Sequence, residues 1–278
     1  MWKSNLLIVL IFFPWCLEAK SFTPSEVGRI IESVGPDAST KFISLLSDKR
    51  LRKTDGMVDF NITKPIKLSM EKYSHFTDPY ASKLAKKFHK KWRKQLSLAQ
   101  KRYKVDARVI TSILLVETSF GRFTGNYQPL SVFASILVDV DTFKEKQEYR
   151  ELPNSQKERV ERKQAWAVRE LKAISNLTKK YPSLDILKIK GSYAGAFGKC
   201  QFLPSSYLAF AVSHRSRKVP NLFDEKDAIL SVANYLVSNG YKHSMDSKGS
   251  YDSIYHYNNS DVYVKTVLAV AKKLNKLP

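Results

Sequence analysis

Residues 109–121 read VITSILLVETSFG, and this stretch decides the fold. An apolar run ends in a single acid, Glu117, and a glycine follows at position 121. Asp106 precedes the run where an aspartate favours a helix N-cap, and Gly121 stands where a glycine favours a helix end. The pattern predicts a buried helix that ends at Gly121 and carries a carboxylate near its end.

A carboxylate at the end of a buried helix is partly removed from water. Because desolvation disfavours the charged form, we expect the pKa of Glu117 to lie above the unperturbed value of about 4.3. An acid that keeps its proton near neutral pH can protonate the leaving oxygen of a glycosidic bond. Position alone favours a simpler interpretation, in which Glu117 is an exposed residue of an ordinary core helix. The rest of the chain has to decide between the two.

The 278 residues begin with a short basic start and an apolar stretch too short to span a bilayer. Residues 1–19 are therefore predicted to be a secretory signal peptide. Cys16 leaves a lipid-anchored N-terminus as a second, less favoured interpretation, and no later segment is apolar enough to cross a membrane. Cys200 is then the lone cysteine of the mature chain, so no intramolecular disulfide is expected.

The formal net charge is +21. Such a charge favours a polyanionic environment, which for an exported protein is a cell-wall polymer, although a solvated lysine surface is the simpler explanation. The signal peptide and the lack of a nucleic-acid-binding module argue against a nucleic-acid partner. One face of a predicted helix over residues 78–103 carries Lys83, Lys86, Lys87, Lys90, Lys91, Arg93 and Lys94.

The chain is predicted to be mainly α-helical, with an N-terminal helical lobe over residues 20–75 and a second domain over residues 76–278. Residues 139–162 are charged and poor in apolar side chains, so we expect an exposed excursion there. Residues 191–207, GSYAGAFGKCQFLPSSY, interrupt the helical periodicity with glycines that permit tight turns and close approach to a ligand.

Four segments now combine: ETSFG at 117–121, the glycine-rich block at 191–207, ANYL at 233–236, and YNNS at 257–260 with Tyr263. Their order and spacing resemble the lytic murein transglycosylases of the membrane-bound type B family, firmly from residue 76 onward. The resemblance implies a lysozyme-like fold, with Glu117 as the sole catalytic acid and base and no cofactor. It also implies substrate contacts from Ser192, Gln201, Phe202, Tyr235, Tyr257, Asn258 and Tyr263.

The implied reaction is non-hydrolytic cleavage of peptidoglycan glycan strands, by an exported monomer in the periplasm or outside the cell. We find no convincing second carboxylate, since the acids of residues 139–148 lie in the charged stretch and Asp261 suits the first turn of a helix. Two alternatives stay open: a hydrolytic muramidase on the same fold, and an inactive cationic wall-binding protein.

Some relatives carry an acidic, cation-binding loop just before the segment that matches residues 221–224. Here residues 213–218 read SHRSRK, without a carboxylate cluster, so no calcium site is expected. The histidines also lack the spacing of zinc motifs.

Overall fold

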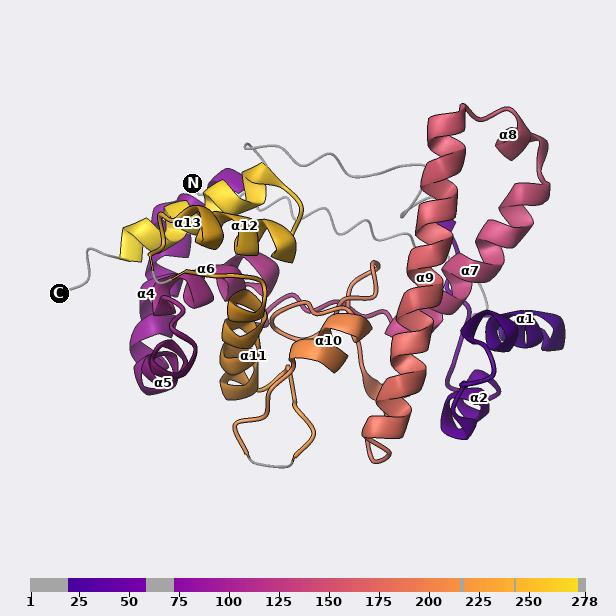
Figure 1. The fold of residues 1–278 in the computed structure, drawn as a ribbon, viewed down its shortest axis with the longest axis horizontal. Coiled ribbons are helices and arrows are strands. Elements are labelled where there is room, and N and C mark those ends of the chain that lie inside the picture. The colour runs from indigo at the N-terminus through magenta and orange to yellow at the C-terminus, as the bar shows by residue number, and fades with distance from the viewer. Residues whose placement is uncertain (1–19, 59–72, 216–217, 243, 275–278) are drawn as a thin grey trace, which may run out of the picture.

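The computed structural model describes residues 20–58, 73–215, 218–242 and 244–274 (Figure 1). The predicted signal peptide, Cys16 included, lies outside these residues. In the part that the structure describes, regular structure is helical apart from three isolated β-bridges, which confirms the mainly α prediction. None of the described helices is both long and apolar enough to cross a membrane.

The first group of helices contains α1 (Pro24–Val34), α2 (Thr40–Leu46), α7 (Pro129–Glu145), α8 (Gln147–Arg150) and α9 (Asn154–Lys180). Figure 1 shows α9 as the long helix, with α7 beside it, α8 at the turn between them, and α1 and α2 against their flank. The N-terminal helices thus pack on elements from the middle of the chain. The predicted domain boundary at residues 75 and 76 stays a prediction.

The second group surrounds α6 (Ala107–Thr118). It contains η2 (Ser74–Thr77), α4 (Pro79–Lys91), α5 (Arg93–Tyr103), α11 (Glu225–Ser238), α12 (Lys248–Tyr257) and α13 (Asp261–Leu274). Helices α4, α5, α11 and α13 all contact α6. Between the two groups lies α10 (Pro204–Phe210), which touches both α9 and α11 (Figure 1). The short η3 (Ile186–Lys188) follows α9 in the chain.

Helix α6 begins as the sequence predicts, because the Asp106 side chain accepts a hydrogen bond from the Arg108 amide at 2.8 Å. Ten of its twelve residues are buried, so the helix forms the centre of the second group. It ends at Thr118 rather than at Gly121. Ser119 and Phe120 adopt left-handed φ angles of 48° and 62°, which turn the chain away directly after the last helical residue.

Residues 139–162 are mostly exposed, as expected, but they are helical rather than an interruption of the helices. Helix α7 continues to Glu145, α8 follows, and α9 begins at Asn154. Two acids of α7 pair with the N-terminal segment: Asp139 with Lys53 at 2.9 Å and Asp141 with Arg29 at 2.7 Å. Their helix is stabilised by packing and ion pairs across the lobe, which apolar periodicity cannot reveal.

The predicted helix over residues 78–103 is divided at Trp92 into α4 and α5. All seven predicted cationic residues of its polar face, from Lys83 to Lys94, are exposed. None of them forms an ion pair with a carboxylate of the described residues. This face, which we call the lysine face, therefore carries uncompensated positive charge.

Candidate active site

Glu117 lies in the last turn of α6, where α13 packs against it. The hydroxyl of Tyr263 donates a hydrogen bond to Glu117 Oε1 at 2.6 Å. Burial raises the pKa of Glu117 to about 7, and the hydrogen bond from Tyr263 opposes that rise by favouring the charged form. The carboxyl group can therefore both give and take a proton near neutral pH.

Three tyrosines form a wall that leads away from Glu117. Tyr257 stacks on Tyr263 with ring centroids 6.4 Å apart, and Tyr235 meets Tyr257 edge-on at 4.7 Å. The Tyr257 hydroxyl donates to the Cys200 carbonyl at 2.6 Å, and that of Tyr235 donates to the His256 carbonyl at 2.8 Å. Because both hydroxyls are held by backbone, the orientations of the rings are set before any ligand arrives.

The loop of residues 191–203 contacts the tyrosine wall, since its Cys200 carbonyl accepts the hydrogen bond from Tyr257. Backbone hydrogen bonds join Gly191 to Tyr127 in both directions, at 2.7 and 2.9 Å, and join Phe197 to Phe202. Gly195 has a φ angle of +75°, and a Cβ there would lie 2.4 Å from the ring of Phe133 on α7. A glycine is required at that position, because the loop presses directly against the first group of helices.

Gln201 occupies a strained position in this loop, with a φ angle of +48°. Its Nε2 donates to the carbonyls of Thr124 at 3.3 Å and Gly198 at 3.0 Å. With the amide donor engaged by backbone, Oε1 is the atom left for a ligand. The substrate contact that the resemblance implies for Gln201 stays a prediction.

The remaining predicted site residues lie around the same wall. Phe202 is buried and packs on Tyr235 and Tyr257, with centroids 5.6 and 5.9 Å away. Ser192 is half-buried, and its hydroxyl donates to the Ala196 carbonyl at 3.3 Å. Asn258 ends α12 directly after Tyr257 and is also half-buried. Hydrogen-bond and ring contacts join Glu117, the three tyrosines and Phe202. Among the described residues, no hydrogen bond joins Ser192, Gln201 or Asn258 to Glu117.

Two tyrosines of the site escaped the sequence analysis. Tyr73 meets Tyr263 edge-on at 6.5 Å, and burial together with the nearby charge of Glu117 raises the pKa of its hydroxyl. Tyr193 is half-buried near Tyr73, and burial raises its pKa too. Tyr193 directly follows Ser192 and could have been included on that ground. Tyr73 lies in the N-terminal segment, where the resemblance is weak.

Within the described residues, no second carboxylate influences the pKa of Glu117. Asp261 accepts a hydrogen bond from the Tyr251 hydroxyl at 2.5 Å, and Asp139 and Asp141 form their ion pairs in the first group of helices. The candidate site therefore contains one acid, a row of aromatic side chains and a glycine-shaped loop. Such a site can donate and accept a proton beside a sugar ring, but it offers no carboxylate nucleophile.

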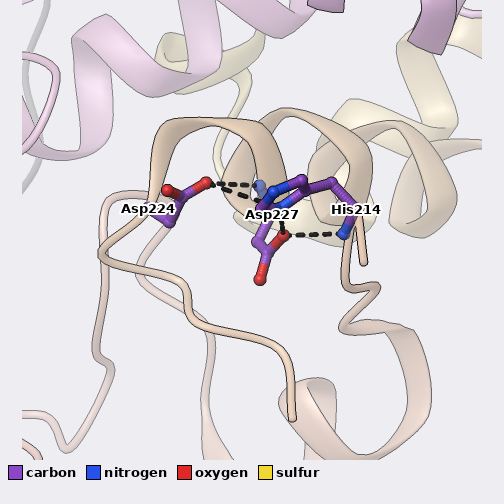
Figure 2. A group of neighbouring side chains, drawn as sticks. All are labelled: His214, Asp224 and Asp227. Atoms are coloured by element: carbon purple, nitrogen blue, oxygen red, sulfur yellow. Dashed lines mark hydrogen bonds and ion pairs between the residues drawn. The ribbon is translucent and has the colours of Figure 1, made fainter. Parts of the chain in front are cut away.

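A separate cluster joins His214 to Asp224 and Asp227 (Figure 2), with donor atoms within 4.8 Å of one another. The Asp227 carboxylate accepts from the amide and Nδ1 of His214 at 2.7 and 2.6 Å, and from the Asn221 amide at 2.7 Å. Asp224 caps α11. Calcium requires about six to eight oxygen ligands. Both carboxylates are already used by protein donors, so this donor set does not fit calcium and instead clamps the loop before α11.

The helical fold is that of lysozyme-like lytic transglycosylases. The lytic transglycosylase SltB1 from Pseudomonas aeruginosa superposes with a TM-score of 0.73 at 21% identity, over 92% of this chain and 98% of that one. The Escherichia coli lytic transglycosylase Slt35, solved in complex with calcium, gives 0.70 at 20% identity, over 91% and 93% of the two chains. At these identities the likeness shows the fold alone.

The model of the transglycosylase SLT domain matches residues 18–249, and the chain belongs to this family. The membrane-bound lytic murein transglycosylase B of Escherichia coli is 31% identical over 154 residues, which make up 55% of this chain. The match spans 37% of that relative's length. The family predicted from the four sequence segments is therefore confirmed.

Proposed function

We propose that this protein is an exported peptidoglycan lytic transglycosylase with Glu117 as its only acid and base. It cleaves the β-1,4 bond between N-acetylmuramic acid and N-acetylglucosamine and leaves a 1,6-anhydro end. The single observation that carries this proposal is the lone half-buried carboxyl group, with a pKa of about 7, beside the tyrosine wall. Family membership supports it.

In the first step, protonated Glu117 gives its proton to the glycosidic oxygen as the bond breaks. Within the described residues, no second carboxylate lies beside Glu117 to attack the anomeric carbon, so in this proposal the substrate's own 2-acetamido oxygen stabilises the positive charge. In the second step, Glu117 takes the proton of the C6 hydroxyl while O6 bonds to the anomeric carbon. The acid is thereby regenerated, and the hydrogen bond from Tyr263 stabilises its charged form between the two steps.

Ring closure has to outcompete hydrolysis, which requires that water be kept away from the anomeric carbon. Tyr235, Tyr257, Tyr263 and Phe202 provide an apolar wall for that purpose. Ser192 and Asn258 are the residues that we assign to the acetamido group, and Gln201 Oε1 can accept a hydrogen bond from a sugar. A related fold, SltB3 from Pseudomonas aeruginosa, has been solved in complex with NAG-anhNAM-pentapeptide; it superposes with a TM-score of 0.72 at 16% identity.

The decisive experiment is mass analysis of the products released from purified peptidoglycan sacculi. We expect muropeptides with 1,6-anhydro ends, each one water lighter than a hydrolytic product. Reducing N-acetylmuramic acid ends would instead identify a muramidase, with Glu117 still as the acid. Binding without release of products would identify an inactive cationic wall-binding protein.

We also infer that the mature protein begins after residue 19, acts as a monomer in the periplasm or outside the cell, and binds peptidoglycan rather than nucleic acid. No metal is needed for the proposed chemistry. N-terminal sequencing of the exported protein tests the cleavage position. A mature chain that begins at a lipid-modified Cys16 would instead identify a lipid-anchored protein.

A further inference from the structure

Exposed aromatic rings gather beside the candidate site. Four aromatic side chains stand among the exposed large hydrophobic residues of the described structure: Tyr80 at 58%, Phe123 at 48%, Phe223 at 38% and Tyr127 at 37%. Phe123 and Tyr127 belong to the loop of residues 119–128, which follows Glu117 directly. Single exposed apolar residues are ordinary, whereas two such rings on one loop, with Tyr80 joined to that loop by a hydrogen bond, form a candidate binding surface.

Tyr80 and Phe123 are joined through Arg122. The Arg122 guanidinium donates a hydrogen bond to the Tyr80 hydroxyl at 2.9 Å and lies 5.9 Å from the centre of the Phe123 ring. The side chain of Arg122 forms no ion pair with a carboxylate of the described residues. We call Tyr80, Arg122 and Phe123 the aromatic shelf.

The aromatic shelf is held against the end of α6. The amides of Gly121 and Phe123 both donate to the Thr118 carbonyl at 3.1 Å, and the Gly121 amide also donates to the Thr118 hydroxyl at 2.9 Å. That hydroxyl in turn donates to the Lys199 carbonyl at 2.8 Å, in the loop that carries Gln201. The backbone of the shelf is therefore fixed to the residue that follows Glu117.

The segment before α4 also connects the aromatic shelf to the candidate site. Tyr73 lies close enough to Glu117 for the carboxylate to affect its pKa, and η2 leads from Tyr73 to Tyr80. The loop after α6 and the segment from Tyr73 to Tyr80 both begin near Glu117. The hydrogen bond between Arg122 and Tyr80 joins them a second time. Phe120, in the same loop as Arg122, stacks on Phe88 of α4 at 4.1 Å. This ring pair also joins the loop that carries Phe123 to the helix that carries Tyr80.

We propose that the aromatic shelf binds peptidoglycan beyond the two sugars that react, an inference that rests on the proposed function. Tyr80 and Phe123 offer ring faces for the apolar face of a sugar. Arg122 has a planar array of donors and no acidic partner among the described residues, so it can pair with a carboxylate of a stem peptide. The combination of rings and a guanidinium without such a partner fits a glycan that carries acidic peptides better than it fits an uncharged polysaccharide.

The test measures binding in a Glu117→Gln background, so that the strand is not cleaved. Calorimetry compares short glycan strands with strands several disaccharides longer, each with and without stem peptides. Covering about 50 Å² of ring surface at about 25 cal/mol per Å² corresponds to roughly a tenfold change in Kd. Longer strands should bind more tightly than short ones. We expect the double variant Tyr80→Ala, Phe123→Ala to reduce this gain in affinity by roughly tenfold or more. Phe123→Tyr, which keeps the ring, restores its share of that gain.

Arg122→Gln should remove the extra affinity that stem peptides give, while the effect of strand length remains. Leu98→Ala is the matched control, because Leu98 is 50% exposed on α5 and has no part in the shelf. If the shelf variants bind long, peptide-bearing strands as tightly as the Leu98→Ala control does, the shelf proposal is overturned while the proposed function stands. If the Glu117→Gln parent bound no strand at all, both the shelf proposal and the proposed function would be contradicted.

Discussion

Replacing Glu117 with glutamine should abolish cleavage and, at alkaline pH, make the protein more stable. Burial raises the pKa of Glu117 from 4.5 to about 7 in the folded chain. Between these two values the folded state binds the proton more tightly than the unfolded state, so the stability of the wild type falls as pH rises. At about 1.4 kcal/mol per pH unit, the loss is complete above pH 7 and amounts to roughly 3 kcal/mol.

Glutamine keeps nearly the same shape, can still accept the hydrogen bond from Tyr263, and does not titrate. The Glu117→Gln variant should therefore be more stable than the wild type by up to roughly 3 kcal/mol at pH 8, and by much less at pH 5. Urea unfolding of both proteins at the two pH values measures the difference. Sacculus digestion measures the loss of activity.

Glu170 offers a control of opposite sign. It is fully buried in α9, and its carboxylate accepts hydrogen bonds from the amide and hydroxyl of Ser205, both at 2.9 Å. Glu170→Gln weakens the hold on the start of α10 and should lower stability at both pH values. If Glu117→Gln instead gave the same stability difference at pH 5 and pH 8, the pKa of Glu117 would not be raised in the folded protein. Full activity in that variant would refute the role of Glu117 as acid.

Three further predictions concern neighbouring features. Tyr263→Phe removes the hydrogen bond that favours charged Glu117, so the pKa of the acid should rise and the alkaline fall of kcat/KM should move to higher pH; an unmoved limb would contradict this. His214→Ala leaves the buried Asp227 carboxylate short of a partner and should cost about 1–3 kcal/mol, whereas a chelator should leave Tm unchanged; a Tm that falls with chelator would reveal a bound metal. Replacing the lysines of the lysine face with glutamine should flatten the salt dependence of wall binding, since exposed charges are screened over about 10 Å at 0.1 M salt; equal salt dependence in the two proteins would rule out long-range capture.

Local chemistry made part of this structure predictable. The Asp106 cap and the apolar run define where α6 begins, because a helix start depends on hydrogen bonds within one turn. Asp224 caps α11 in the same way, whereas Pro204 begins α10 at a first-turn position where its missing N–H costs no hydrogen bond. The order of the four segments was sufficient to predict the family, and that resemblance made Glu117 the candidate acid.

Contacts between distant residues decided the rest. The charged stretch in α7 is helical because Asp139 and Asp141 reach partners on the N-terminal segment, and local periodicity carries no record of those pairs. The sequence indicated that the pKa of Glu117 is raised, but its partner Tyr263 lies 146 positions away, and only the packing of α13 on α6 brings them together. Desolvation depends on every atom that surrounds a group, so its extent at Glu117 was decided by tertiary structure.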